Sequence, residues 1–219
     1  MNSVDEANGD MSGVRPRWVR AGQSLILPLG LLAVILCGLW YWDSRGDSGS
    51  RADDAYGAVE LPAARNPTGR SPAPEVGRAG PDFLLERPDG GTLRLSDFQG
   101  QPIVLNFWAS WCAPCRAEMP ELVRAYAKHR DDGLEIVAVN LQETNGKVLS
   151  FADEFGIEFP IAIDRDGELK DIWRLGGPFG GIPSSYFLDE AGVVQDIVYG
   201  PLTDEMLAER IELLLAGTS

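Results

Sequence analysis

The stretch IVLNFWASWCAPCRAEMP, residues 103–120, decides the fold. Its first six residues form a continuous apolar run, which is typical of a strand buried on both faces. The residues after the second cysteine have helical texture, and Pro114 suits the first turn of a helix. Cys112 and Cys115 therefore lie where a buried strand gives way to a helix.

Strand-like and helix-like segments alternate on both sides of this stretch. FLLE and TLRL, separated by PDGG, predict a β-hairpin ahead of it, and SSYFLD and VVQDIVYG predict a second hairpin near the C-terminus. Between them we expect strands at 134–141 and 159–164, and helices at 113–130, 148–155 and 168–175. Thr203 is a candidate cap for a final helix that reaches about residue 215. This order predicts an α/β domain with a central sheet of mixed direction and flanking helices.

The charge of the chain is strongly acidic, with 33 Asp and Glu against 19 Lys and Arg and a net charge of −14. A negative field repels phosphate backbones, so the composition excludes nucleic acid as a partner. The chain has three cysteines, too few for a disulfide scaffold. The third, Cys37, lies in an apolar run and is expected to behave as a small hydrophobic residue.

That apolar run, LILPLGLLAVILCGLWYW at 25–42, has 18 residues without a charge. As a helix it would span about 27 Å, close to the thickness of a hydrocarbon core. Arg15, Arg17 and Arg20 precede it, which favours a cytoplasmic N-terminus and an extracytoplasmic remainder. We expect a retained transmembrane signal anchor at 24–42 after a cytoplasmic tail at 1–23, with a cleaved signal peptide as the alternative.

The segment at 43–75 is rich in Gly, Ser, Ala, Pro, Asp and Arg. Such a composition buries little apolar surface, so we expect a flexible extracytoplasmic linker. The folded domain is expected to occupy 76–219, with the first hairpin as an N-terminal extension.

The spacing of Cys112 and Cys115 allows three interpretations. A structural zinc site needs four ligands, and the domain offers this pair and a distant His129. A purely structural disulfide would close a very small loop and constrain the unfolded chain little. A redox couple fits best, because the amides and dipole of a helix N-terminus favour the Cys112 thiolate, while Cys115 can resolve a mixed disulfide. Trp111 would supply an apolar surface for substrate.

The sequence resembles the membrane-anchored TlpA/ResA-like thiol-disulfide oxidoreductases of the thioredoxin superfamily, which share the redoxin or AhpC/TSA-like domain. The resemblance is carried by GPDFLLERPDGGTLRLSDFQGQPIVLNFWASWCAPCRAEMPEL at 80–122 and by GIPSSYFLDEAG at 181–192. It implies a thioredoxin-like fold and a redox-active disulfide between Cys112 and Cys115.

The resemblance also assigns roles to residues outside the pair. Pro183 would be a cis-proline facing the cysteines, and the backbone of Ile182 would bind an incoming substrate strand. Glu118 would be a half-buried carboxylate that takes the proton of Cys115. Asn106 stands where thioredoxins proper have a buried Asp, so it cannot act as a base. The glycine-rich segment at 175–181 is longer than usual and should border the site.

We therefore expect an extracytoplasmic enzyme that reduces protein disulfides, receives electrons from an unidentified transmembrane donor and uses no cofactor or metal. The family implies apocytochrome c as one substrate. The alternatives are a thiol oxidase or isomerase, a peroxiredoxin-like peroxide reductase, and a non-catalytic binding module. The peroxidatic motif needs Pro and Thr or Ser at two positions that here hold Leu105 and Ala109, which argues against peroxide reduction.

Overall fold

The computed structural model describes residues 32, 34–37 and 56–217, which belong to two separate units, residues 1–51 and 52–219. In the first unit, Leu32 and the segment 34–37 are helical. Within the described ranges, no helix is both long and apolar enough to cross a membrane. The predicted tail at 1–23, most of the predicted anchor at 24–42 and the first part of the predicted linker lie outside the described residues.

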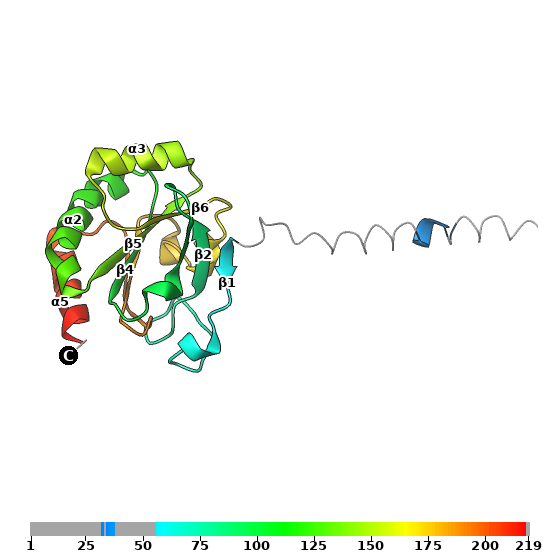
Figure 1. Cartoon of the computed structure of the whole chain (residues 1–219), viewed down its shortest axis with the longest axis horizontal. Coiled ribbons are helices and arrows are strands. Elements are labelled where there is room, and N and C mark those ends of the chain that lie inside the picture. The colour runs from blue at the N-terminus through cyan, green and yellow to red at the C-terminus, as the bar shows by residue number, and fades with distance from the viewer. Residues whose placement is uncertain (1–31, 33, 38–55, 218–219) are drawn as a thin grey trace, which may run out of the picture. The chain divides into compact units, whose positions relative to one another are not determined.

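The second unit is built on a single eight-stranded sheet with helices on both faces (Figure 1). Its strands are β1 (Gly57–Val59), β2 (Asp82–Glu86), β3 (Thr92–Arg94), β4 (Ile103–Trp108), β5 (Glu135–Leu141), β6 (Ile161–Asp164), β7 (Ser184–Leu188) and β8 (Val194–Tyr199). Its α-helices are α2 (Ala113–His129), α3 (Asn145–Phe155), α4 (Leu169–Ile172) and α5 (Asp204–Ala216). Short 3-10 helices occupy Ala63–Arg65, Leu95–Phe98, Arg130–Asp132 and Gly177–Phe179.

The sheet has mixed direction, as the sequence predicts. Its strand order is β1-β2-β6-β5-β4-β7-β8, and β3 pairs with β2. The three central strands β4, β5 and β6 run parallel, whereas β7 and β8 extend the sheet in antiparallel fashion. Both predicted hairpins are present, β2 with β3 and β7 with β8. Because β7 is antiparallel to β4, its first residue lies beside the carboxyl end of β4, where the Cys pair follows.

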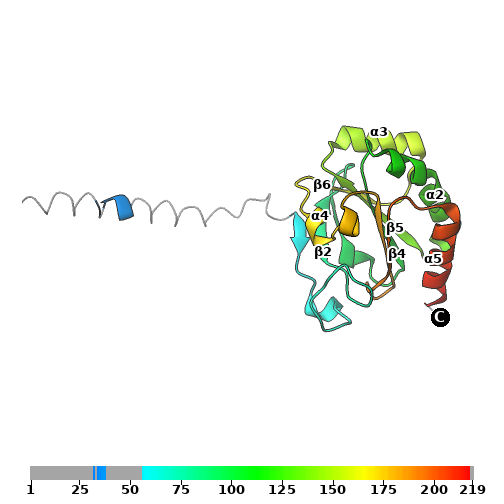
Figure 2. The same cartoon turned by 180° about the vertical axis from the view of Figure 1, so that it is seen from behind.

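Alternation along β4 divides the core between the two faces of the sheet. Val104 and Trp108 join the apolar cluster that is covered by α2, α3 and α5, which Figure 1 shows on one side. Ile103, Leu105 and Phe107 join the opposite cluster, which includes Trp173 just after α4 (Figure 2). Every residue of β4 is buried, so the strand fixes the position of the loop that carries Cys112.

The domain begins earlier than the sequence predicts. Residues 56–75, expected to be part of the flexible linker, form an N-terminal strap that packs on the sheet. Within the strap, β1 pairs with the outer edge of β2, with Ala58 opposite Phe83. Leu61 is buried, and Arg65 donates a hydrogen bond of 2.6 Å to the carbonyl oxygen of Ser96. The polar composition concealed this packing, because backbone pairing, a few apolar side chains and the Arg65 side chain carry it. The folded domain therefore reaches at least from residue 56, well before residue 76.

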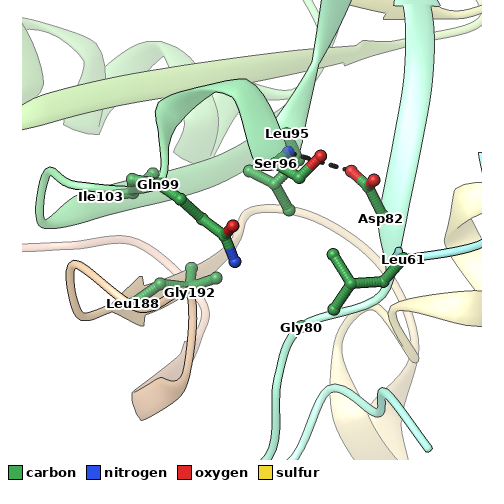
Figure 3. A pocket seen from close by; sticks show the side chains of 9 residues that line it. All are labelled: Leu61, Gly80, Asp82, Leu95, Ser96, Gln99, Ile103, Leu188 and Gly192. Carbon is green, nitrogen blue, oxygen red and sulfur yellow. Dashed lines mark hydrogen bonds between the residues drawn. The ribbon is translucent and has the colours of Figure 1, made fainter. Parts of the chain in front are cut away.

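A buried ion pair lies beneath the strap. Asp82 on β2 is 2% exposed, and it accepts hydrogen bonds from Nε of Arg94 at 2.7 Å and from the amide of Ser96 at 3.0 Å. Nη2 of Arg94 also donates to the carbonyl oxygen of Glu60 in the strap, at 2.9 Å. Figure 3 shows Leu61 and Asp82 close to each other among the residues that line a small pocket. The strap thus covers a charge that would otherwise face solvent on this side.

We expect the strap to stabilise the domain. A chain that begins at residue 76 should lose about 2 to 4 kcal/mol of unfolding free energy relative to one that begins at residue 56, because it exposes apolar surface and loses backbone pairing. In the longer chain, Leu61→Ala should cost about 2 kcal/mol by itself. Urea denaturation followed by circular dichroism measures both changes. Equal midpoints for the two truncated chains would show that the strap adds nothing to stability.

Candidate active site

Cys112 and Cys115 are joined by a disulfide at the N-terminus of α2. Cys112 is the N-cap residue of the helix, and the amide of Cys115 donates a hydrogen bond of 3.2 Å to its Sγ. Backbone N–H groups at this end of a helix stabilise a negative charge on the N-cap atom. The geometry therefore favours a thiolate on Cys112 when the pair is reduced.

The two cysteine residues differ in exposure. Cys112 is 5% exposed and Cys115 is fully buried. Trp111, directly before the pair, is 69% exposed, whereas Trp108 lies in the core. An exposed indole at this position offers an apolar surface to a partner that approaches Cys112. Cys112 can therefore meet a substrate sulfur, and Cys115 can act only from inside.

The segment before β7 lies directly against Cys112. The Ile182–Pro183 peptide bond is cis, as the resemblance implies. The carbonyl oxygen of Ile182 lies 3.8 Å from Sγ of Cys112. Pro183 has no amide hydrogen, and its own carbonyl oxygen accepts a hydrogen bond of 2.9 Å from the amide of Gly200. The structure therefore brings the two sequence-distant signatures together at one sulfur atom.

The glycine-rich segment at 175–181 folds back on itself beside this loop. The hydroxyl of Ser184 accepts a hydrogen bond from the amide of Gly176 at 2.7 Å and donates one to the carbonyl oxygen of Gly181 at 2.9 Å. A Cβ atom at Gly176 would lie 2.2 Å from the nitrogen of Gly181, so this close approach requires glycine. The segment leads directly into Ile182 and so borders the Cys pair, as expected.

Glu118 lies one turn beyond Cys115 on α2 and is more deeply buried than the sequence predicts. We expected a half-buried carboxylate, but the residue is 1% exposed. Its Oε1 accepts a hydrogen bond of 2.9 Å from the side chain of Asn106, and its Oε2 accepts one of 2.7 Å from the amide of Leu202. Burial raises the pKa of the carboxyl to about 7, although both hydrogen bonds oppose the rise. Glu118 can therefore gain or lose a proton near neutral pH.

Asn106 holds this carboxylate in place instead of acting as a base. Its Nδ2 donates both to Glu118 and to the hydroxyl of Ser185, which lies opposite it on β7, at 3.0 Å. The amide of Leu202 completes the network from the loop before α5. Sequence reasoning missed Ser185 and Leu202. The Leu202 contact comes from the backbone, so no residue type could have revealed it.

A second buried carboxylate, Glu143, was also missed. It follows β5 and accepts hydrogen bonds from the amide and the hydroxyl of Ser110, at 2.7 and 2.5 Å, and from the side chain of Asn140 at 2.8 Å. Burial alone would raise the pKa of Glu143, but the hydrogen bonds from Asn140 and Ser110 outweigh it and hold the pKa below its usual range. A Glu two residues after a predicted strand, at the same edge as the Cys pair, was the available signal.

Within the described residues, no group of three or more His, Cys, Asp or Glu side chains is arranged to hold a metal ion. His129, the one histidine of the chain, lies at the far end of α2 beside Asp132. What the site can do by itself is exchange a disulfide: it has an accessible sulfur, a buried resolving sulfur and a carboxyl that titrates near neutrality.

Comparison with known proteins agrees with this chemistry. The model of the AhpC/TSA family matches residues 76–197. The thiol-disulfide oxidoreductase ResA of Oceanobacillus iheyensis is 43% identical over 136 residues, which cover 60% of this chain and 69% of the relative. ResA of Bacillus subtilis is 30% identical over 193 residues, which cover 88% of this chain and 94% of the relative.

Solved structures give the same result for the fold. StoA of Bacillus subtilis is 32% identical with a TM-score of 0.50, covering 59% of this chain and 96% of its own. A candidate thiol:disulfide interchange protein DsbE from Chlorobium tepidum is 33% identical with a TM-score of 0.59. The match covers 64% of this chain and 98% of the other. These likenesses confirm the thioredoxin-like α/β fold.

The ionisation of Glu118 gives a pH-dependent expectation. Below pH 7 the carboxyl keeps its proton and cannot take one from Cys115, so disulfide exchange should slow as the pH falls through about 7. Glu118→Gln should remove the part of this dependence that comes from the carboxyl, leaving that of the Cys112 thiolate, and should slow exchange at pH 8 on the order of 100-fold, the low end of what a positioned acid–base group contributes. Stopped-flow fluorescence of the reduced protein with a small disulfide, from pH 5 to 9, measures both effects.

Glu121→Gln is the matched control, because it removes a partly exposed carboxylate, paired with Arg124, from the same helix. It should retain the wild-type profile. A Glu118→Gln protein with wild-type rates over the whole pH range would show that Glu118 takes no part in proton transfer.

Proposed function

The chain belongs to the AhpC/TSA family as one of its ResA-like thiol-disulfide oxidoreductases, and on this premise we propose that it reduces disulfides of protein substrates outside the cytoplasm. The observation that carries the proposal is the arrangement around Cys112. Sγ of Cys112, the more exposed cysteine of the pair, lies at a helix N-terminus beside the Ile182 carbonyl, and Cys115 and Glu118 are fully buried on the same helix. This is the arrangement that a dithiol needs in order to attack a disulfide and then resolve it.

The reaction proceeds in two exchanges. The Cys112 thiolate attacks one sulfur of the substrate disulfide, an S–S bond forms between enzyme and substrate, and the other substrate sulfur leaves as a thiolate that takes a proton from water. Cys115 then gives its proton to the Glu118 carboxylate and attacks Sγ of Cys112. The mixed disulfide breaks, and the second substrate sulfur leaves as a thiolate. Two electrons pass to the substrate, and the enzyme ends as the Cys112–Cys115 disulfide.

A thiol reductant must then return two electrons to that disulfide. Since the proposed site lies outside the cytoplasm, we assign this step to a dithiol carried by a transmembrane donor. The substrate proposed first is apocytochrome c, whose paired thiols must be reduced before haem is attached. The resemblance of 80–122 and 181–192 to the TlpA/ResA-like family supports this choice.

The location rests on the N-terminal sequence. The uncharged stretch at 25–42, with Arg15, Arg17 and Arg20 before it, supports a retained anchor that leaves the domain on the outer side of the membrane. The strap shortens the proposed linker to 43–55 at most. A chain of 13 residues spans at most about 47 Å, so the domain would work close to the membrane surface.

The division of labour between the cysteines tests the proposed reaction. Cys115→Ser removes the resolving thiol, so the protein should accumulate mixed disulfides with its substrates that disappear on reduction. Membranes from cells that produce the variant, separated on non-reducing gels and analysed by mass spectrometry, would identify the trapped proteins. Cys112→Ser is the matched control and should trap few or none. Equal trapping by both variants would contradict the assigned roles.

The proposed topology has a separate test. A reporter that is active only outside the cytoplasm, fused after Ser219, should be active, and the protein should stay with the membrane in high salt. The same reporter fused after residue 23 should be inactive. Release of a shortened chain from the membrane would contradict the anchor and favour a cleaved signal peptide.

A further inference from the structure

Glu143 connects the loop that carries Cys112 to the neighbouring strand β5. Both of its carboxylate oxygens accept hydrogen bonds from Ser110, which lies two residues before Cys112. The side chain of Asn140, the last buried residue of β5, also donates to Oε2 at 2.8 Å. The carboxylate therefore joins the β4–α2 loop to the β5–α3 segment at the edge of the sheet where the redox couple lies.

The position of this loop determines the position of Cys112. Ala109 is fully buried and the amide of Cys112 donates to its carbonyl oxygen at 3.1 Å, so the loop is a tight turn. Ser110 is the residue of this turn whose amide and side chain are both held from outside. A carboxylate that accepts both donors leaves the turn little freedom, and a catalytic sulfur must be placed to within a fraction of an ångström.

Glu143 also brings a negative charge close to the couple. It is 6% exposed and forms no ion pair within the described part of the chain. The short chain path from Ser110 places it on the order of 10 Å from Sγ of Cys112. The charged side chain that acts on Glu143 is Lys147 on α3, which favours the ionised carboxylate less than the hydrogen bonds from Asn140 and Ser110 do.

The remaining charged groups near Cys112 do not cancel this charge. On α2 they are Arg116, which is paired with Glu154 of α3, and the buried Glu118. The loop at 181–184 contributes no titratable side chain. Glu143 is thus the buried carboxylate that stays ionised beside the couple, while Glu118 titrates.

We propose that Glu143 is a positioning residue of the redox couple, which fixes the loop through Ser110 and whose negative charge disfavours the Cys112 thiolate. The thiolate exists only in the reduced protein, so a charge that destabilises it destabilises the reduced form. The couple then gives up its two electrons more readily to a substrate disulfide. Glu143 would thereby favour the reductase direction. The inference rests on the thiol-disulfide activity and does not depend on the proposed substrate or location.

Two substitutions of Glu143 separate its effect on the position of the loop from the effect of its charge. Glu143→Gln keeps the three contacts, because its carbonyl oxygen can accept from the amide of Ser110 and from Asn140, and its NH2 group can donate to the Ser110 hydroxyl. It removes only the charge. Glu143→Ala removes both. Asp153→Asn is the matched control, since it removes one negative charge from the exposed side of α3.

The first measurement is the rate of alkylation of Cys112 in the reduced full-length protein against pH, read by mass spectrometry so that Cys37 and Cys115 do not interfere. In Glu143→Gln the midpoint of this pH profile, which reports ionisation of the Cys112 thiol, should fall by about 0.3 to 1 pH unit. Alkylation at a pH below the midpoint should then be about two- to tenfold faster. The equilibrium with a dithiothreitol redox buffer at pH 8 should shift towards the dithiol. A midpoint equal to that of wild type and Asp153→Asn would overturn the role of the charge.

The second measurement is reduction of a small disulfide, which needs no protein partner. Glu143→Gln should stay within about threefold of wild type, whereas Glu143→Ala should lose on the order of tenfold, because the loop is no longer held. Equal rates for the two variants would overturn the positioning role. Failure of the trapping experiment with Cys115→Ser would leave both results intact, so the two proposals fail separately.

Discussion

The structure depends on the burial of one carboxyl group beneath a disulfide. Glu118 has almost no contact with water, and its two hydrogen bonds come from neutral donors. Neutral donors stabilise a carboxylate less than a cation would, so desolvation dominates and the pKa rises to about 7. Three elements must meet for this to happen: β4 supplies Asn106, α2 supplies Glu118 and the loop before α5 supplies Leu202. The α/β sheet and its covering helices bring these three elements to one place.

The contrast between the two buried glutamates near the Cys pair shows how one fold assigns different charges to the same type of side chain. Glu118 receives two hydrogen bonds and titrates near neutrality, whereas Glu143 receives three and remains ionised. Environments that separate the pKa values of two carboxyl groups are a common basis for acid–base roles in enzymes. Here one group exchanges a proton with the couple, and the other holds its loop.

Most of the fold could be predicted from the sequence because β4 and α2 obey simple patterns. A fully apolar strand followed by a cysteine pair and Pro114 determined the position of the site, and Thr203 caps α5 as predicted, with an amide hydrogen bond of 3.2 Å from Met206. The strap escaped prediction because its pairing uses backbone groups and because few of its side chains, Leu61 and Pro74 among them, are buried. The depth of Glu118 also escaped, because it depends on how closely α5 and its preceding loop pack on α2. Spacing along one helix contains no information on that contact.

The most direct test of this account is the titration of the Glu118 carboxyl itself. Side-chain carbon NMR of the oxidised protein, with the signal assigned by its absence in Glu118→Gln, reports the ionisation without any substrate or partner. The account predicts a midpoint at about 7. A midpoint of about 4.3, the value of an exposed glutamate, would contradict it, because the carboxyl could not then exchange a proton with Cys115 near neutral pH.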